Sequence, residues 1–159
     1  MEKAITTALL VIASVIATIA LTNAVIPAVQ RGSGAVLAAS SEVAGRVKTD
    51  LSIVVASGNT SSTEINVWVK NVGVQEVQAI DLSDLFLTTP TTIGRIDYSA
   101  TCASDSPDCW SYAFEGSATA WIQATTIKVT VRLTTLATGQ HTIKFVVPNG
   151  ASIEKIFSI

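Results

Sequence analysis

The chain has 159 residues, of which 48% are hydrophobic and 14% are charged, and its net charge is -2 at neutral pH. A chain this apolar does not stay disordered, and it lacks the basic surplus of a nucleic-acid-binding protein. Beyond a long apolar stretch at the N-terminus, the remainder has the length of one ordinary domain.

The first expected element is an apolar helix over residues 4–26. No charged residue occurs between Lys3 and Arg31. A run longer than about 18 apolar residues can cross a bilayer, and a lone spanning segment must be helical because only a helix satisfies its own backbone in lipid. Leu, Ile and Val fill its whole circumference, which favours burial in lipid or in a bundle of helices.

Small residues recur four apart along this helix. The alanines concerned are Ala4, Ala8, Ala13, Ala17, Ala20 and Ala24. Such spacing places small side chains on one face and lets a second helix approach closely. Small residues are also common in plain single-span anchors, so a packing helix and a simple anchor are both consistent with this pattern.

The helical pattern continues beyond the apolar run. Pro27 is expected to kink the helix, and apolar residues then recur at three-four spacing between Val36 and Val47. We expect one bent helix ending near Lys48, roughly 65–70 Å long at 1.5 Å per residue. Since that exceeds twice the bilayer core, its distal half must stand outside the membrane or pack against something other than lipid.

From Asp50 onward the hydrophobic period changes from 3.6 to 2, which indicates strands. In the first strand Leu51, Ile53 and Val55 are expected to share one face. The expected strands cover residues 51–56, 65–70, one or two within 74–87, then 91–98, 110–114, 127–133, 141–147 and 152–159. Turns at about ten-residue intervals, including 57–62, favour an immunoglobulin-like antiparallel β-sandwich.

The predicted fold class is therefore α+β. Residues 1–48 form the hydrophobic helix and residues 49–159 form the β-sandwich head domain. The transition at residues 46–50 contains no flexible tether, so the head is expected to be held rigidly on the helix.

Two cysteines, Cys102 and Cys109, flank a loop-like segment. In a chain whose head lies outside the cytoplasm, this spacing predicts a disulfide that closes a short loop. A pair of free thiols is the alternative. A zinc site is disfavoured because no second cysteine pair or histidine cluster accompanies them.

The sequence shows no pattern of catalytic chemistry. His141 is expected to be an ordinary surface residue, since a lone histidine lacks catalytic partners. The acid pairs Asp81/Asp84 and Asp105/Asp108 do not have the spacing of a calcium loop. With no phosphate-binding glycine loop and no nucleophile elbow, we expect neither an enzyme nor a cofactor or metal site.

Two further groups of residues allow alternative interpretations. Asn59 begins the sequon Asn-Thr-Ser in a predicted turn and is a possible N-glycosylation site, although such a sequon arises easily by chance in a chain rich in Ser and Thr. The large aromatic residues are expected in the core rather than at an interface; they are Trp68, Trp110, Trp121 and Phe114.

An apolar N-terminal helix that leads into a small β-sandwich resembles the type IV pilin superfamily, and within it the archaeal flagellin (archaellin) family with its related archaellum motor proteins. The resemblance is carried by the helix over residues 6–24 and by Arg-Val-Lys-Thr-Asp-Leu-Ser-Ile-Val at 46–54. It is also carried by the strand from Ile65 to Gly73, which ends in Val-Lys-Asn-Val-Gly. Together these cover about residues 1–87.

The resemblance implies a filament subunit that polymerises with itself through its helices, with the sandwiches on the outer surface. It implies a membrane-bound stage before assembly, motor and platform proteins of the export machinery as partners, and an extracellular location. Two alternatives come with the family: an envelope-anchored stator-type protein and a non-rotating adhesion pilin.

The chain departs from the family pattern at its start. Its first acidic residue is Glu2 rather than a glutamate at the fifth position, and no leader site is visible, so either Met1 is the first mature residue or a leader has been removed before it. Glu2 and Lys3 are the charged residues that precede Arg31. We hypothesise that they pair with neighbouring subunits or with an amino terminus at the axis of a filament.

Overall fold

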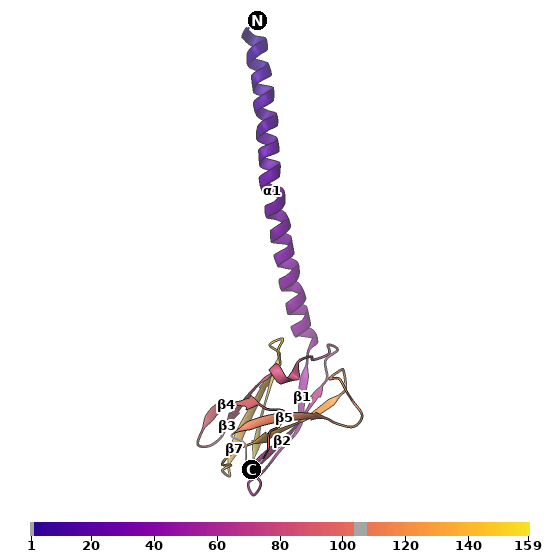
Figure 1. Cartoon of the computed structure of the whole chain (residues 1–159), viewed down its shortest axis with the longest axis vertical. Coiled ribbons are helices and arrows are strands. Elements are labelled where there is room, and N and C mark those ends of the chain that lie inside the picture. The colour runs from indigo at the N-terminus through magenta and orange to yellow at the C-terminus, as the bar shows by residue number, and fades with distance from the viewer. Residues whose placement is uncertain (1, 104–107) are drawn as a thin grey trace. The chain divides into compact units, whose positions relative to one another are not determined.

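The computed structural model describes residues 2–103 and 108–159. Over these residues the chain forms one α-helix, one short 3₁₀ helix and eight strands (Figure 1). They are α1 (Glu2–Lys48), β1 (Leu51–Asn59), β2 (Glu64–Asn71), η1 (Ile80–Leu82), β3 (Asp84–Thr88), β4 (Ile93–Tyr98), β5 (Cys109–Phe114), β6 (Thr126–Arg132), β7 (Gln140–Val146) and β8 (Ser152–Ser158). The chain divides into two compact units, Met1–Val43 and Ala44–Ile159, and we refer to the second as the head.

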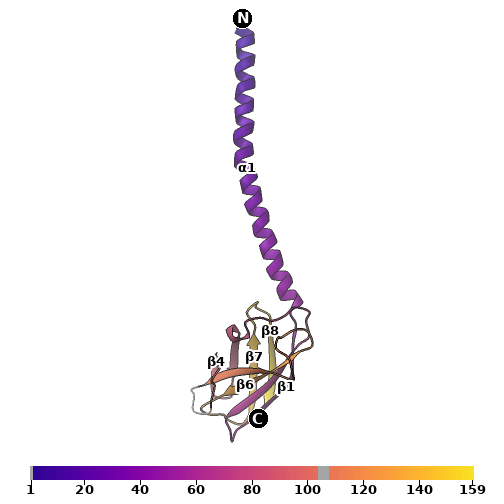
Figure 2. The same cartoon turned by 45° about the vertical axis from the view of Figure 1, so that its right-hand side comes forward.

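Helix α1 is continuous over 47 residues, with Pro27 inside it. At 1.5 Å per residue it is about 70 Å long. Proline removes one backbone donor and crowds the preceding turn. The helix changes direction near its middle without a break (Figure 2). The change of period at Asp50 marks the end of the helix, as the sequence predicted.

The strands of the head form one continuous order, β1-β2-β6-β5-β4-β3-β7-β8. The order has two halves, β1-β2-β6-β5 and β4-β3-β7-β8, and within each half the neighbouring strands are antiparallel. A short parallel pairing of β4 with β5, at Asp97–Cys109 and Tyr98–Trp110, joins the halves. The fold is thus an α+β chain with a mostly antiparallel sandwich that approaches a barrel, which confirms the predicted class.

Strands β1 and β8 stand at the two ends of the order, and a side chain bridges them. Lys155 on β8 donates from Nζ to the carbonyl oxygens of Ile53 and Val54 on β1, each at 3.0 Å. Free strand edges expose unpaired backbone groups that invite pairing with other chains. The ammonium group occupies acceptors at one such edge.

Alternating residues of the strands build the core of the head. Strands β2 and β6 contribute six side chains of at most 1% exposure: Ile65, Val67, Val69, Ile127, Val129 and Val131. The rings of Trp110 and Phe145 pack edge to face with centroids 5.5 Å apart. Full burial of one such side chain contributes about 1.5–3 kcal/mol, so this core is the main source of the head's stability.

A bulge in β1 overturns the predicted alternation of that strand. Ile53 pairs with Val69, but Val55 pairs with Trp68, so Val54 is an extra residue. Because one inserted residue reverses which face later side chains occupy, Val55 is 48% exposed and Ala56 packs against the core instead. The expectation that Val55 shares a face with Ile53 is wrong.

Two other boundaries differ from the sequence expectation. Strand β1 extends to Asn59, so the turn occupies residues 60–63 rather than 57–62. Between residues 74 and 87, the described structure has the one-turn helix η1 and the single strand β3. The rest of that segment is irregular apart from a bridge between Val77 and Trp121.

Candidate functional site

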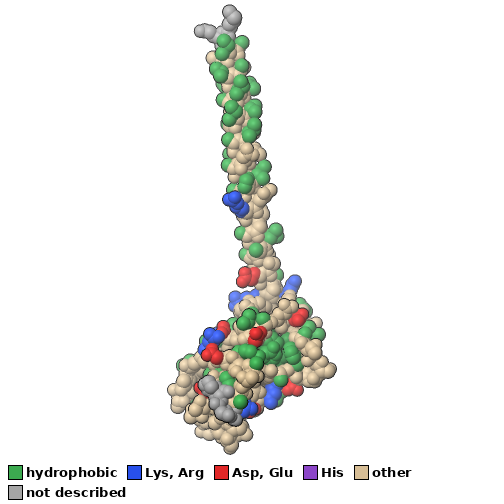
Figure 3. All heavy atoms as spheres, viewed as in Figure 1, with side chains coloured by type: hydrophobic (Ala, Val, Ile, Leu, Met, Phe, Trp, Pro, Cys, Tyr) green, Lys and Arg blue, Asp and Glu red, His purple; other side chains and the backbone are tan. Residues whose placement is uncertain are grey.

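The apolar surface of α1 is the largest candidate functional feature. From Lys3 to Val43 every side chain is exposed, and Figure 3 shows hydrophobic side chains along the helix. Leu10 and Ile16, for example, are 72% and 61% exposed. The charge-free interval 4–30 is about 40 Å long, which exceeds the bilayer core of about 30 Å. Among the described residues, α1 is the one helix long and apolar enough to cross a membrane.

Seven hydroxyl groups of this helix are bonded within the helix itself. Thr7 donates to the Lys3 carbonyl at 2.7 Å, and Thr18 donates to the Ser14 carbonyl at 2.8 Å. The same back-bonding to the preceding turn occurs at Thr6, Ser14, Thr22, Ser33 and Ser41. A hydroxyl without a partner would be costly in hydrocarbon. These bonds therefore make the seven hydroxyl groups compatible with lipid or with a dry helix bundle.

The predicted packing and charge residues of α1 all lie on this surface or at its start. The six small residues Ala4, Ala8, Ala13, Ala17, Ala20 and Ala24 are exposed and remain a predicted packing face. Lys3 is exposed too. The side chain of Glu2 lies outside the described part of the structure, so the proposed pairing of Glu2 and Lys3 stays a hypothesis.

The distal half of α1 differs chemically from the first half. Arg31 introduces a charge, and Glu42, Arg46 and Lys48 follow, all exposed. Both halves have an exposed surface, but only the first contains an uncharged stretch long enough to cross a bilayer. The helix is therefore divided into a lipid-compatible part and a water-compatible part.

Backbone bonds of the head cap the end of α1. The Lys48 carbonyl accepts hydrogen bonds from the N–H groups of Val74 and Gln75, at 3.0 and 3.2 Å. The Asp50 carbonyl accepts from Val72 and Gly73, both at 2.9 Å. The last carbonyls of a helix have no partner within the helix, and the segment that follows β2 supplies one for Lys48.

Asn71 and Gly73 make this cap possible. Asn71 is fully buried, and its Nδ2 donates to the carbonyls of Gln75 and Trp121 at 2.8 and 3.0 Å. Its Oδ1 accepts the Gly73 N–H at 3.0 Å. A Cβ on Gly73 would collide with backbone atoms of Lys48 and Asp50. In the sequence these two residues mark only the end of a strand, because their capping role depends on tertiary contacts.

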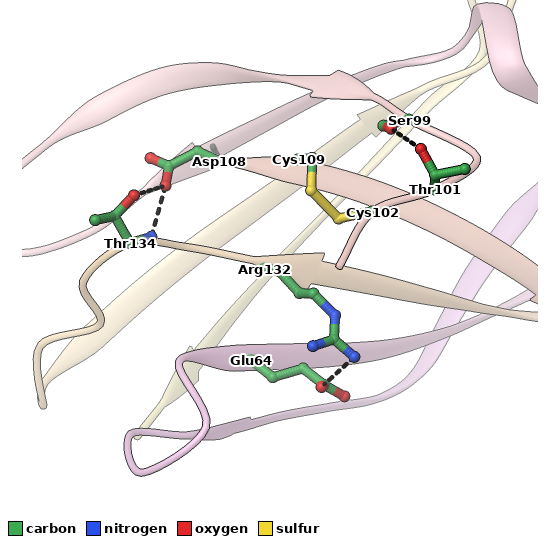
Figure 4. Close-up of a disulfide and its surroundings, with 8 residues drawn as sticks. All are labelled: Glu64, Ser99, Thr101, Cys102, Asp108, Cys109, Arg132 and Thr134. Atoms are coloured by element: carbon green, nitrogen blue, oxygen red, sulfur yellow. Dashed lines mark hydrogen bonds and ion pairs between the residues drawn. A yellow bond between two sulfur atoms is a disulfide. The ribbon is translucent and has the colours of Figure 1, made fainter. Parts of the chain in front are cut away.

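The predicted disulfide between Cys102 and Cys109 is present, with the two Cα atoms 5.8 Å apart (Figure 4). Cys109 is buried at the start of β5, while Cys102 lies in the preceding loop. Next to it, Asp108 accepts two bonds through Oδ1, from Thr134 N at 2.6 Å and from its hydroxyl at 2.9 Å. The bridge thus links the first residue of β5 to the preceding loop, and the carboxylate links the residue before it to the segment that follows β6. A disulfide is typical of a domain outside the cytoplasm.

His141 is buried, contrary to the sequence expectation of a surface position. Its side chain has 0% exposure, its Nε2 lies 2.9 Å from the Ala137 carbonyl, and its ring stacks on Phe157. The period of two along β7 places it on the same inward face as Ile143 and Phe145. This alternation could have predicted from the sequence that His141 is buried, despite the turn next to it. His141 serves packing and has no catalytic partner among the described residues.

Trp68 differs from the other two tryptophans of the chain. Trp110 and Trp121 are buried as expected, but Trp68 is half-buried on the outer face of β2. Its Nε1 donates to Glu115 at 2.8 Å, and the Lys128 ammonium lies 5.5 Å from its ring centroid. Together with Val54, Val55 and Thr126 it lines a shallow apolar cavity of about 320 Å³.

A second cavity, of about 290 Å³, is lined by aromatic and acidic residues that include Tyr112, Phe114, Glu76 and Asp81. Burial raises the pKa of Tyr112, and Tyr98 and Asp81 raise it further, so the phenol stays protonated at neutral pH. These groups provide neither a nucleophile–base pair nor a proton relay.

The described members of the acidic pairs have other partners or stand apart from further metal ligands. Asp84 is paired with Arg95 at 2.9 Å, and Asp108 accepts from Thr134. Asp105 lies outside the described residues. In the described ranges no group of three or more His, Cys, Asp or Glu side chains is placed to hold a metal ion.

Comparison with known proteins gives a match over nearly the whole chain. A sequence model described as archaeal-type flagellin matches residues 2–155. A protein of Archaeoglobus fulgidus, described as uncharacterized, is 28% identical over 167 residues, which cover 99% of this chain and 98% of that protein.

Two solved structures share the fold. One is the archaellum periplasmic stator protein FlaG from Sulfolobus acidocaldarius, with a TM-score of 0.57, 21% identity and coverage of 69% of this chain and 99% of that chain. The other is the stator protein complex of FlaF and FlaG from the same organism, with a TM-score of 0.56, 20% identity and coverage of 67% and 87%. At this identity the likeness establishes the fold alone.

Proposed function

The chain belongs to the archaeal-type flagellin family, and we propose that within this family it is an envelope-anchored archaellum protein of the stator type. In this function α1 holds the protein in the cytoplasmic membrane. The head stands outside the membrane, where it provides a fixed protein surface for the motility machinery. The chain acts as a structural component and not as an enzyme.

The observation that carries the proposal is the likeness to FlaG. That solved chain is matched over 99% of its length, so the head of this protein contains the whole of a fold used by a periplasmic stator protein. The family model alone does not separate stator from filament, because it spans both helix and head. The likeness to FlaG and to a chain of the FlaF–FlaG complex favours the stator type.

The division of α1 supports the same function. Residues 4–30 form a charge-free surface of about 40 Å, enough to cross the bilayer core once with some tilt. Arg31 and the charges after it then suit the water outside. A charge at the centre of a spanning helix costs about 2.5–3.5 kcal/mol on insertion scales, so the charge-free interval defines where the membrane fits.

The location and partners follow from the family. Archaellum proteins are extracellular or periplasmic and associated with the membrane, and the disulfide at Cys102 and Cys109 suits such a compartment. FlaF and FlaG occur together in a solved complex. By analogy, we expect this head to bind another archaellum protein.

A filament subunit is the second candidate function. It is favoured by the six small residues of α1, whose spacing suits close packing against further helices. In that case the apolar interval would leave the membrane during assembly and be buried among copies of itself. One heterologous contact repeated between copies would then extend the filament.

Immunogold electron microscopy of whole cells tests this choice. Antibodies raised against the head would label the cell envelope, near filament bases, if the protein is of the stator type. Label distributed along the filaments would contradict the proposal and support the filament subunit. Cells that lack the gene serve as the control for antibody specificity.

A further inference from the structure

We propose that the cavity between residues 76–81 and strand β5 binds an arginine side chain of a partner protein outside the cytoplasm. The inference goes beyond the proposed function and rests on one part of it, a head that meets other proteins outside the membrane. The size of the cavity, its aromatic wall and its two carboxylates without an ion pair each point to that ligand.

Buried residues and backbone bonds fix the frame of the cavity. Its lining includes Trp121, Val77 and Ile80, which are 1%, 5% and 4% exposed. The Val77 N–H donates to the Trp121 carbonyl at 3.1 Å, and the Trp121 indole donates to the Thr125 carbonyl at 3.2 Å. The frame is therefore formed before any ligand arrives, which lowers the entropic cost of binding.

A residue in the left-handed conformation directs two acids to the same cavity. Ala79 has φ 51° and ψ 52° and directly precedes η1. Alanine adopts this conformation only where the surrounding structure holds it there. Glu76 lies before this residue and Asp81 after it, and both side chains line the cavity.

No ion pair within the fold neutralises these two carboxylates. In residues 2–103 and 108–159 the ion pairs form around Arg95 and Arg132, and neither group includes Glu76 or Asp81. None of the described lining residues is basic. Burial, Tyr98 and Asp81, in that order, raise the pKa of Tyr112, which agrees with a negative potential in the cavity. Such a potential attracts a cation.

The side of the cavity formed by β5 is aromatic. The rings of Tyr112 and Phe114 pack edge to face with centroids 5.9 Å apart, and Tyr98 adjoins Tyr112 at the same distance. Aromatic faces attract cations. The planar guanidinium of arginine stacks on such faces and also donates to carboxylates in a fork. Rings next to carboxylates therefore favour arginine over the compact ammonium of lysine.

The size and the surroundings of the cavity fit a protein side chain. Its volume is about 290 Å³, just below the range of about 300–1,000 Å³ for pockets that hold drug-sized ligands. Leu82 and Ile122, which directly follow two lining residues, are 69% and 52% exposed. An arginine anchor surrounded by apolar contacts is typical of the centre of a protein interface.

An NMR titration of the full-length protein in micelles of a nonionic detergent tests the proposal. The probe is N-acetylarginine methylamide, and N-acetylcitrulline methylamide is an uncharged control of the same shape. We expect the arginine probe to shift the amide signals of Gln78, Ala79 and Ala120 saturably. The citrulline probe should bind roughly tenfold more weakly, because it lacks the charge that both carboxylates and rings attract. Equal affinities, or no saturable shift at these amides, would overturn the proposal.

Variants locate the binding site. Asp81→Asn and Glu76→Gln each remove one charge with little change of shape and should weaken binding of the arginine probe roughly threefold. Phe114→Leu removes an aromatic face, keeps an apolar side chain and should also weaken binding. Glu154→Gln is the matched control, because this exposed carboxylate lies on β8, away from the cavity. Wild-type affinity in both carboxylate variants would contradict the assignment, provided that their spectra show an intact fold.

Two further probes separate arginine from other cations. N-acetyllysine methylamide presents an ammonium group, and tetramethylammonium stands for small organic cations such as lipid headgroups. Either one binding as tightly as the arginine probe would contradict an arginine site. A failed titration would leave the proposed function standing, because that function is tested by the position of the protein on the cell. Immunogold label along the filaments would in turn leave the cavity's ligand standing, since the head of a filament subunit is also outside the cell.

Discussion

Gly73 and Asn71 determine how the chain passes from helix to sheet. The Asn71 side chain forms three hydrogen bonds with backbone groups. Because Gly73 has no side chain, its backbone can lie against that of Asp50 and Lys48. A buried polar side chain is tolerated only when its groups are bonded. Here each bond also positions the segment that caps Lys48.

Gly73→Ala should destabilise the head by about 2–3 kcal/mol, because the added methyl group meets backbone rather than a movable side chain. Urea unfolding of the full chain in detergent micelles, followed by tryptophan fluorescence, measures this change. Gly94→Ala is the control: its Cβ would meet nothing within 4 Å, and its stability should stay within about 0.5 kcal/mol of wild type. Equal stability of the two variants would refute the role of Gly73.

Individual side-chain positions were only partly predictable from sequence. Period-two alternation correctly placed Ile65, Val67 and Val69 in the core. It failed at Val55, because a bulge leaves no mark in the hydrophobic pattern when Val54 and Val55 are both apolar. For His141 the alternation was present, but the lone polar ring beside a turn suggested the surface.

The disulfide of the loop before β5 contributes stability at the scale of an element. Closing a loop of this length, with a sequence separation of 7, restricts the unfolded chain by about 2.5 kcal/mol in the chain-entropy description. The bridge also holds Cys109 next to the pairing of β4 with β5. The loss of the bridge should therefore loosen the joint between the two halves of the sheet.

Replacing both cysteines by serine should lower the free energy of unfolding by about 2–3 kcal/mol. Reduction of the wild-type protein with dithiothreitol should have a similar effect, and the double variant should not respond to dithiothreitol. Urea unfolding with and without the reductant measures both. A wild-type midpoint unaffected by reduction would show that the bridge does not stabilise the head.

Lys155 links the two end strands of the sheet, β8 and β1. Its ammonium group donates to the Ile53 and Val54 carbonyls, and hydrogen bonds to charged groups contribute about 1.5–3 kcal/mol each. Exposure of Lys155 is intermediate, so solvent lowers this value. The side chain stabilises the near-closure of the sheet and also occupies acceptors on β1.

Lys155→Met keeps most of the aliphatic stem but loses both bonds, and it should cost about 1–2 kcal/mol of stability. It should also increase self-association of the solubilised protein, because the β1 edge regains free acceptors. Unfolding curves and analytical ultracentrifugation measure the two effects. Lys144→Met, at an exposed position on β7, should change neither. A change of the same size in Lys144→Met would contradict the edge role.

The helix and the strongly alternating strands could be predicted from the sequence more reliably than the pairing between strands. The long apolar run fixed the existence of α1, and the strongly alternating segment from Ile127 to Leu133 corresponds to β6. The weakly patterned residues 74–83 form one short helix and no strand. The isolated bridge from Val77 to Trp121 joins residues far apart in the sequence, so no local pattern reveals it. Sheet order was not accessible, because it depends on non-local pairing.

At the scale of the whole molecule, the division of α1 at Arg31 is the central feature. The first part has the length and apolarity of a membrane span, and the second carries charges. Sequence established this division, because composition decides what lipid tolerates. It could not choose between anchor and filament subunit, because lipid and a dry helix bundle select the same side chains.

Ile16→Asp should weaken membrane association, since Asp near the centre of a span costs about 2.5–3.5 kcal/mol, equivalent to roughly a hundredfold change in partitioning. Flotation of the protein with liposomes of archaeal lipids measures the bound fraction. Val36→Asp is the control in the charged half of α1, where Val36 is 69% exposed, and should float like wild type. If Ile16→Asp also floats like wild type, residues 4–30 are not the membrane anchor.

Shearing of cells followed by fractionation tests the proposed function most directly. Filaments released by shear are separated from the cells, and the membranes are then collected and treated with detergent. We predict that the protein stays with the membranes and enters solution only with detergent, because its apolar helix resides in the bilayer. Recovery of most of the protein in the sheared filaments would contradict the proposal and identify it as a filament subunit.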